Sequence, residues 1–224
     1  IDLAKRNGSN LHVLHLTTKK EMDQFVSGEI DTKKITAEVC VHHLRFNEHD
    51  YVDLGNQIKC NPSIKKEEDR AAVMAALLND QIDIIATDHA PHTWEEKSGP
   101  YSKAPAGLPL VQHAVQVLLD FYHDGTLSLE HIVKKTSHNV AKRFQIKDRG
   151  YIREGYYADL VILDIEKPHT VKKEDLLYKC DWSPFEGTTF NSSINTTIIN
   201  GHIGYKDSKI QENIRFGKQI EFSR

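Results

Sequence analysis

Polar side chains that bind metals or transfer protons follow three short apolar segments of the sequence. His15 lies near the end of the first segment, Asn61 precedes a proline after the second, and Asp88 opens the sequence DHAPH, which ends at His92. If these segments are parallel strands, their carboxyl ends lie at one edge, where active sites of α/β proteins form. An imidazole and a carboxylate are suitable ligands for Zn²⁺, and a carboxylate beside a metal can accept a proton from water. The pattern predicts metal-assisted hydrolysis.

Each of these residues also has an ordinary structural interpretation when it is taken alone. A single histidine after a strand, such as His15, is commonly structural, and an aspartate there, such as Asp88, commonly caps a helix. Asn61-Pro62 is typical of a turn, and the His42-His43 pair could lie in solvent. The chain has 13 histidines, so isolated matches carry little weight. The hypothesis depends on these residues occurring together, in order, at strand ends.

Apolar segments alternate with helical patterns through the first part of the chain. The predicted strands cover residues 11–16, 35–41, 57–61 and 82–86, and the predicted helices cover residues 17–27, 65–78, 109–122 and 129–144. Residues 1–6 resemble the last turns of a helix that stops at Asn7-Gly8, and Ser128 is the expected N-cap of the last helix. Alternation of this kind indicates parallel βα units, either in an open doubly wound sheet or in part of a (β/α)8 barrel.

The pattern changes after Gly150, where short strand-like segments replace the helices. Residues 151–152 and 158–164 have strand character, and residues 194–199 and 203–205 form a predicted hairpin across Asn200-Gly201. Asn-Gly between two β-branched segments is the strongest short-range hairpin signal. The sequence therefore predicts two regions, residues 1–149 with βα units and residues 150–224 as a small β module.

Composition excludes several classes of function. The 224 residues are 39% hydrophobic and 27% charged with a net charge of −3, and the basic residues are interspersed with acidic ones, so no nucleic-acid partner is expected. The longest apolar runs fall far short of the roughly 20 residues that cross a bilayer, so no membrane span is expected. Three separated cysteines without a CxxC pair argue against a disulfide framework and favour a reducing cytoplasm.

Segments along nearly the whole chain resemble, in order and spacing, the motifs of dihydroorotases, the zinc-dependent cyclic amidohydrolases of pyrimidine biosynthesis. These segments are LHVLHLTT (11–18), ITAEVCVHHL (35–44), KCNPSIKKEEDR (59–70), DIIATDHAPHTWEEK (83–97), KAPAGLP (103–109), DGTLSL (124–129), GYIREGYYADLVILD (150–164) and WSPFEG (182–187). ATDHAPH is highly specific for this family, whereas ADLVILD is shared by many amidohydrolases. The resemblance implies the C-terminal half of a dihydroorotase.

The resemblance implies an α/β fold with the second half of a (β/α)8 TIM-type barrel over residues 1–149. It also implies that residues 150–224 are a C-terminal β module, part of a composite β-sandwich. Four predicted strands are too few for a closed barrel, which needs about 250 residues.

The resemblance also implies the metal site and the catalytic base. His15 matches a histidine that binds the more exposed of two zinc ions, and Asp88 matches an aspartate that binds the other zinc and acts as the general base. Zinc would lower the pKa of a bound water toward about 7. Asp88 would take the proton of this water as it attacks the ring amide of dihydroorotate and pass it to the leaving nitrogen. The product is N-carbamoyl-L-aspartate, and the reverse reaction closes the ring.

The substrate-binding residues that the resemblance implies follow the same segments. Asn61 matches a substrate-binding asparagine, although NPSIK here departs from the family's NPPLR. His92 matches the histidine that contacts the substrate carboxylate, and the main chain of Ala106 and Gly107 matches a loop that closes over the substrate. His43 and Glu38 match residues around the metal site. Leu14 replaces a cysteine that some relatives use with this glutamate for an additional zinc, so we expect no third zinc there.

Other groups of the family's site have no match in this chain. The HxHxR motif, the bridging aspartate or carboxylated lysine and a further histidine belong to the family's N-terminal half. His15 and Asp88 are two ligands, whereas a catalytic zinc ordinarily has three from protein. We therefore expect two zinc ions in a complete site, a missing N-terminal half as partner and an inactive fragment in isolation. A homodimer is a further expected form of assembly.

Two other interpretations remain open from the sequence. The chain could belong to a hydantoinase or allantoinase, but those families usually have Cys-Pro-Gln-Tyr or Cys-Pro-His-Tyr where this chain has residues 40–43, Cys-Val-His-His. It could also be a non-catalytic dihydroorotase-like partner of aspartate transcarbamoylase. The joint presence of His15, Asn61, Asp88 and His92 favours an enzyme.

Overall fold

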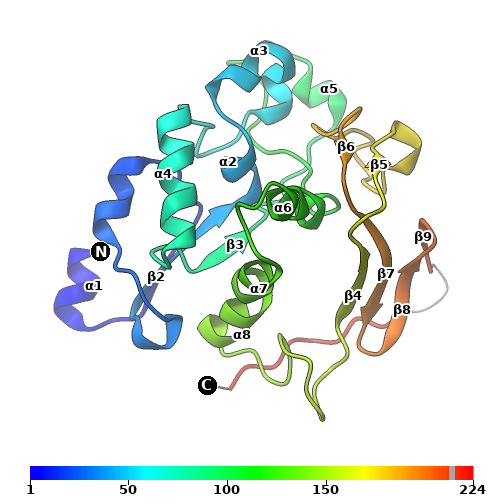
Figure 1. Ribbon diagram of the computed structural model, residues 1–224. Helices are drawn as coiled ribbons and strands as arrows, with labels where there is room; N and C mark the ends of the chain where they lie inside the picture. Colours follow the sequence, from blue (N-terminus) through cyan, green and yellow to red (C-terminus); the bar gives the residue numbers. More distant parts are fainter. Residues whose placement is uncertain (212–214, 224) are drawn as a thin grey trace. The chain divides into compact units, whose positions relative to one another are not determined.

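The structure is a computed structural model, which describes residues 1–211 and 215–223 (Figure 1). It contains two compact units. The first consists of residues 1–117 and 171–188, and the second consists of residues 118–170 and 189–224. Every residue of the predicted metal and substrate site belongs to the first unit.

A three-stranded parallel sheet forms the centre of the first unit. Its strands are β1 (Leu11–Val13), β2 (Ile35–Cys40) and β3 (Ile84–Ala86), in the order β1-β2-β3. Leu11 pairs with Ile35, and Glu38 pairs with Ile84. The parallel pairing confirms the predicted βα units. Because β2 has a neighbour on each side, its end is the natural centre of a site at the carboxyl edge of the sheet.

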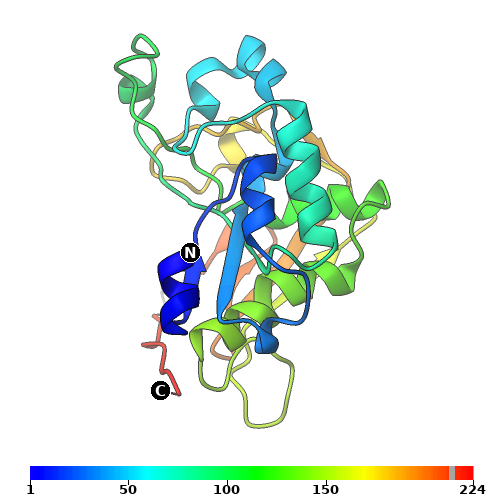
Figure 2. The same cartoon turned by 90° about the vertical axis from the view of Figure 1, so that its left-hand side faces the viewer.

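Short helices connect and cover these strands. They are α1 (Asp2–Asn7), η1 (Lys19–Gln24), η2 (Ile30–Thr32), α2 (Val41–Arg45), η3 (Glu48–Asp50), α3 (Tyr51–Leu54), η4 (Gly55–Ile58), α4 (Glu67–Leu78), α5 (Trp94–Lys97) and η6 (Lys173–Asp175). The longest, α4, runs alongside β2 in both views (Figures 1 and 2) and confirms the predicted helix. It buries Val73, Met74, Ala76 and Leu77.

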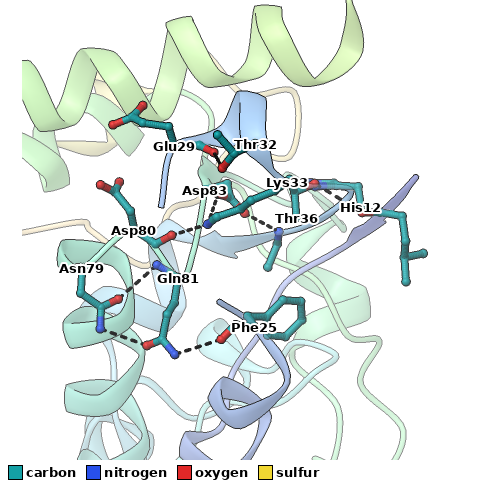
Figure 3. Close-up of polar contacts among 12 residues, drawn as sticks. His12, Phe25, Glu29, Thr32, Lys33, Thr36, Asn79, Asp80, Gln81 and Asp83 are labelled. Atoms are coloured by element: carbon teal, nitrogen blue, oxygen red, sulfur yellow. Dashed lines mark hydrogen bonds and ion pairs between the residues drawn. The ribbon is translucent and has the colours of Figure 1, made fainter. Parts of the chain in front are cut away.

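A buried ion pair fixes the amino ends of two neighbouring strands. Lys33 Nζ lies 2.7 Å from Asp83 Oδ1, and both side chains are 2% exposed. The other carboxylate oxygen of Asp83 accepts a hydrogen bond from the Ala37 amide at 2.9 Å. Lys33 also donates to the main-chain carbonyl of Asp80 (Figure 3). The pair thus ties the segment before β2 to the segment before β3, opposite the edge that carries the predicted site.

Two elements of the first unit differ from the sequence predictions. The strand predicted at residues 57–61 is absent, because η4 covers Gly55–Ile58 and the following Lys59 carbonyl accepts hydrogen bonds from Gly107 and Lys97. The helix predicted at 17–27 is only the 3₁₀ helix η1. Its start is fixed by the Glu21 carboxylate, which accepts from the amides of Thr17 and Thr18.

The helix predicted at residues 109–122 begins later, as α6 (Ala114–His123). The preceding residues are held elsewhere, because the amide of Leu110 donates to His89 Nδ1 at 3.0 Å. The boundary between the two units falls within α6, after Val117.

The second unit combines a helical segment with antiparallel strands. The helical segment consists of α7 (Leu129–Val133), a π-helical turn η5 (Lys134–His138) and α8 (Asn139–Phe144). Ser128 caps it by accepting from the His131 amide at 3.1 Å, which confirms that prediction. The four-stranded sheet has the order β4 (Leu160–Asp164), β7 (Ser193–Ile199), β8 (His202–Lys206) and β9 (Lys209–Ile210).

A two-stranded sheet of β5 (His169–Thr170) and β6 (Thr189–Phe190) completes the strands that the structure describes.

The predicted hairpin is confirmed, since β7 and β8 are joined by Asn200 and Gly201 with φ values of 51° and 84°. The strand predicted at residues 151–152 is wrong, because these residues lie in a bend between turns. No helix among the described residues has the length and apolar character to span a bilayer. Cys40, Cys60 and Cys180 are all free thiols.

Candidate active site

His15 lies in an irregular segment just beyond β1. Val13 still pairs with Ala37 of β2, and the amide of Leu16 donates to the Glu38 carbonyl at 2.9 Å, so Leu14 and His15 form a bulge between two anchored positions. The φ of His15 is +40°, a conformation that is uncommon and costly for residues other than glycine. Because of this bulge, the partly exposed imidazole of His15 does not follow the alternation of side-chain directions along the strand.

Asp88 occupies the equivalent position beyond β3. Its φ is +47°, and its side chain is exposed. The residues after it are fixed by a second segment, because the Ala90 amide donates to the Leu108 carbonyl at 3.3 Å and His89 forms a bridge with Leu108. The carboxylate is therefore carried by a main chain held on both sides.

His15 and Asp88 both affect the ionisation of residues at the end of β2. His15 contributes to lowering the pKa of both His42 and His43, although burial is the main cause for each. Asp88 contributes to raising the pKa of Cys40, again after burial, and Cys40 is the last residue of β2. The imidazole and the carboxylate thus act on one buried cluster from the two flanking strands.

Asn61 follows a buried cysteine and is itself exposed. The main chain beside it is anchored from below, because His43 Nε2 donates to the Pro62 carbonyl at 2.9 Å and Cys60 Sγ contacts the same oxygen at 3.1 Å. The asparagine amide is therefore available for a ligand while its backbone is fixed.

His92 and Ala106, two predicted substrate-binding residues, are in direct contact. His92 Nε2 lies 3.2 Å from the Ala106 carbonyl oxygen, and its Nδ1 lies 3.3 Å from the Glu96 carboxylate. The carbonyl oxygen can only accept, so Nε2 carries the proton of this hydrogen bond. The main-chain carbonyl of His92 accepts from the buried indole of Trp182 at 2.8 Å, which fixes the loop. An anionic ligand would replace Ala106 as the acceptor.

Gly107 is buried and has a backbone that only glycine tolerates. Its φ is +131°, and a Cβ there would lie 2.5 Å from the Ala90 carbonyl oxygen. Its amide already donates to the Lys59 carbonyl at 2.9 Å. The exposed main chain of this loop is therefore that of Ala106, with Gly107 fixing its position.

Lys97 fixes the same loop from beneath, and no sequence motif singled it out. Its ammonium donates to the carbonyls of Lys59, Pro105 and Gly107 at 3.2, 3.0 and 2.8 Å, and the side chain is fully buried. Burial lowers its pKa to about 8. Three donors thus meet three acceptors. A lysine in a polar helix gives no signal of burial in the sequence.

Glu38, which was expected near the metal site, forms a pair with His12. Glu38 Oε2 lies 3.0 Å from His12 Nε2, and the other nitrogen of this ring lies 2.9 Å from Thr36 Oγ1. The two side chains of the pair are 13% and 7% exposed, respectively. His12, which no sequence pattern distinguished from other histidines, is thus integrated between β1 and β2.

His42 and His43 are buried, so the solvated pair considered from sequence is wrong. They are 0% and 4% exposed, and their rings lie 4.0 Å apart. Both nitrogens of His42 and Nδ1 of His43 lack a hydrogen-bond partner. Each unsatisfied buried nitrogen costs about 1–3 kcal/mol. The pair therefore needs a physical explanation that ordinary packing does not give.

The chemistry of His15 and Asp88 fits part of a zinc site. One imidazole nitrogen and one carboxylate oxygen are ordinary zinc ligands. Both residues have strained backbones at strand ends on either side of β2, and such strain accompanies functional sites. They supply two ligands, fewer than the three that a catalytic zinc ordinarily takes from protein.

The chain is similar to known amidohydrolases along most of its length. A family model described as the amidohydrolase family matches residues 7–204. A dihydroorotase of Clostridium acetobutylicum is 36% identical over 206 residues, which are 92% of this chain and 48% of that protein. A dihydroorotase of Pyrococcus horikoshii is 34% identical over 94% of this chain and 48% of its own length. An allantoinase of Desulfitobacterium hafniense is 33% identical over 94% of this chain and 47% of its own length.

Solved structures of the same kind share the fold. L-Hydantoinase from Arthrobacter aurescens superposes with a TM-score of 0.88 at 24% identity, over 97% of this chain and 49% of its own. D-Hydantoinase from a Thermus species gives a TM-score of 0.82 at 21% identity, over 93% of this chain and 47% of its own. At these identities the likeness concerns the fold alone. The chain spans about half the length of the proteins it matches.

Proposed function

Because the chain belongs to the amidohydrolase family, we propose that it supplies the C-terminal half of a dihydroorotase active site. The reaction is the reversible interconversion of N-carbamoyl-L-aspartate and dihydroorotate. The observation that carries the proposal is the ATDHAPH segment, which holds Asp88 at a strand end and His92 against Ala106. The dihydroorotases among the relatives support the same substrate.

The proposed fold of the whole protein is a (β/α)8 barrel to which residues 1–149 contribute the second half. The parallel order β1-β2-β3 and the hydantoinase-like fold support this. Residues 150–224 are proposed to form a β module within a composite β-sandwich, which the antiparallel sheet of β4, β7, β8 and β9 supports. The boundary at residue 149 stays a prediction, as does a cytoplasmic location.

His15 and Asp88 are the residues that would hold zinc, two ions in a complete site. When bound, zinc lowers the pKa of a coordinated water toward about 7 and polarises a carbonyl oxygen. The remaining ligands would come from polypeptide that these residues do not include, so the proposed partner is the N-terminal half. A homodimer remains a proposal for the assembled protein.

Asp88 performs the proton transfers of the proposed mechanism. Its carboxylate accepts a proton from the attacking water and delivers it to the ring nitrogen as the amide bond breaks. In the reverse direction it removes a proton from the carbamoyl nitrogen during ring closure. The main chain fixed by Leu108 holds the carboxylate in place for both transfers.

Asn61, His92 and Ala106 are proposed to bind the substrate. The substrate carboxylate takes the place of the Ala106 carbonyl on His92 Nε2, while Glu96 keeps its contact with Nδ1. The freed Ala106 main chain and the Asn61 amide then contact the ring. Gly107 stays bonded to Lys59 and positions this loop.

Allantoinase is the second candidate, and the relative from Desulfitobacterium hafniense supports it. A test offers dihydroorotate, allantoin and hydantoin to the native protein that contains these residues. We expect hydrolysis of dihydroorotate and cyclisation of carbamoyl aspartate. Preference for allantoin or hydantoin would reject the dihydroorotase assignment. A non-catalytic partner of aspartate transcarbamoylase would turn over none of the three.

Asp88→Ala separates catalysis from binding in the same assay. We expect loss of both reaction directions, because the substitution removes a metal ligand and the base at once. Asn61→Ala and His92→Ala should instead weaken binding by about 1–3 kcal/mol each, because a buried substrate group loses its partner. Near-normal turnover by Asp88→Ala would contradict the mechanism.

We propose that the 224-residue chain alone is inactive. Two ligands are too few for a two-metal site, and half of a barrel leaves sheet edges unpaired. The test is a cyclisation assay of the purified chain, before and after addition of the N-terminal half of a dihydroorotase. Activity should appear only in the mixture. Substantial activity of the chain without a second polypeptide would refute this proposal.

A further inference from the structure

Cys40, His42 and His43 form a buried cluster at the junction of β2 and α2. The thiol sulfur and one ring nitrogen of each histidine lie within 4.8 Å of one another. Cys40 and His42 are 0% exposed and His43 is 4% exposed. Zinc–sulfur and zinc–nitrogen bond lengths imply ligand separations of about 3.4 Å around a tetrahedral ion. Zinc binding would therefore bring the three ligand atoms closer together than the separations of up to 4.8 Å that they have in this structure.

Hydrogen bonding selects the ligand atom of His43. Its Nε2 donates to the Pro62 carbonyl at 2.9 Å, so the proton is on Nε2 and the lone pair is on Nδ1. Nδ1 is buried and has no hydrogen-bond partner. A metal-binding histidine commonly donates its other N–H to a carbonyl, which fixes the tautomer and orients the ring. His43 has this arrangement without any ion.

His42 supplies a second nitrogen that packing leaves unused. Neither ring nitrogen forms a hydrogen bond of ordinary geometry, although the Thr87 main chain lies near enough to affect the pKa of the ring. Burial lowers the pKa of both histidines, that of His43 to about 4, so both rings are neutral at pH 7. Neutral imidazole is the form that coordinates metals.

The charges around Cys40 favour a cation over a proton. Glu38 and Asp88, together with burial, raise the pKa of the Cys40 thiol. The same two carboxylates would attract a positive ion in this position. An ion with two neutral imidazoles and one thiolate keeps one positive charge, which these carboxylates would balance.

We propose that Cys40, His42 and His43 bind a zinc ion, or a similar borderline-soft divalent cation, at a site separate from His15 and Asp88. Binding forms a metal–sulfur bond and releases the Cys40 thiol proton to solvent. The ion would tie the end of β2 to the first turn of α2. It also satisfies Nδ1 of His43 and one of the two ring nitrogens of His42 that lack a partner. The site uses Cys40 as a ligand, so it differs from the additional zinc excluded by Leu14.

Cobalt provides a direct test because a thiolate ligand gives it a near-ultraviolet charge-transfer absorption. The chain is produced in zinc-depleted, cobalt-supplemented medium, so that the ion enters during folding of this fully buried site. Bound cobalt and the absorption are then measured. We expect the thiolate absorption in the wild-type chain. His15 and Asp88 include no thiol and cannot produce it, and a folded wild-type chain without it would overturn the proposal.

Matched variants identify the ligand. Cys40→Ser should weaken cobalt binding at this site by at least about 100-fold, because even the loss of supporting residues costs 10- to 100-fold. Cys60→Ser is the control, since Cys60 is a buried thiol that contacts the Pro62 carbonyl and lies outside the three-ligand group. It should keep the absorption. Equal loss in both variants would reject the assignment to Cys40.

A second variant pair tests whether the site is separate. His42→Leu should lose the absorption while retaining the far-ultraviolet circular dichroism of the folded chain. Asp88→Asn should keep the absorption, because Asp88 is not one of the three ligands, although the loss of its charge should weaken cobalt binding. Loss of the absorption in Asp88→Asn with an intact fold would show one shared site and overturn the proposal.

Discussion

Replacing Gly107 with alanine should destabilise the chain and misplace the proposed catalytic loop. The new Cβ would lie 2.5 Å from the Ala90 carbonyl oxygen and 2.8 Å from the Ala90 Cβ, and the φ of +131° is unsuited to alanine. Ala90 cannot retreat freely, because its amide donates to the Leu108 carbonyl. Backbone strain of about 1–3 kcal/mol and overpacking of about 1–3 kcal/mol give a loss of about 2–6 kcal/mol.

Two other glycines of the same unit separate these contributions. Gly187 has a φ of +81° and no atom within 4 Å of where an added Cβ would lie, so Gly187→Ala tests strain alone and should cost about 1–2 kcal/mol. Gly99 has open space and no such φ, so Gly99→Ala should change stability by less than about 1 kcal/mol. The order of the three variants therefore tests the geometry.

Urea unfolding followed by circular dichroism measures the free energy of unfolding of each variant. In the dihydroorotase proposed above, Gly107→Ala should also raise the KM for dihydroorotate, since Ala106 and His92 shift with the loop. Equal unfolding free energies for Gly107→Ala and Gly99→Ala would refute the close approach to Ala90. A Gly107→Ala variant as costly as Gly187→Ala, and no more, would refute the overpacking contribution.

Three further predictions concern buried ionisable side chains. Lys33→Met should lower the free energy of unfolding by about 3–5 kcal/mol in urea, because Asp83 is left buried without its cation. The double variant Lys33→Met/Asp83→Leu should recover part of this loss, and equal stabilities of the single and double variants would contradict the prediction. The pKa of His43 falls from 6.5 to about 4 on folding, so the unfolded chain binds more protons between these values and stability should rise with pH across them; His43→Gln should show a flatter profile. The pKa of Lys97 falls from 10.5 to about 8, so stability should rise with pH between 8 and 10.5, and an identical slope in Lys97→Met would exclude Lys97 as its source.

Local sequence signals predicted the elements whose hydrogen bonds are local. The helix α4 and the Asn200-Gly201 turn of the β7–β8 hairpin are examples, because each depends on residues close in sequence, although α4 buries Val73, Met74, Ala76 and Leu77 and not the face of Ala71, Met74, Ala75 and Leu78 that its apolar spacing predicts. The missing strand at 57–61 shows the opposite case. Its Lys59 carbonyl bonds to Gly107 and Lys97, tens of residues away, and no pattern within the segment reveals these partners.

The residues of the candidate site also include some that the sequence predicted and some that it did not. His15, Asn61 and Asp88 were selected because they follow predicted strands. The structure places His15 and Asp88 beyond β1 and β3, whereas the strand predicted before Asn61 is absent, and the roles of all three stay predictions. The burial of Lys97 and His42 did not follow, because charged and polar side chains are ordinarily exposed. The proximity of Cys40, His42 and His43 in the sequence was a usable signal, but only burial distinguishes a ligand cluster from a solvated pair.

The residues that hold the site are as informative as the residues that would react. Asp88 is exposed, so its substitution tests chemistry with little effect on the fold. Gly107 and Lys97 touch no substrate in the proposed mechanism, yet they fix the Ala106 loop through the Lys59 carbonyl that both contact. A loop held in this way transmits its own displacement directly to His92. Since positioning errors of about 1 Å can cost about 100-fold in rate, we expect substitution of these supporting residues to lower the rate of the proposed reaction.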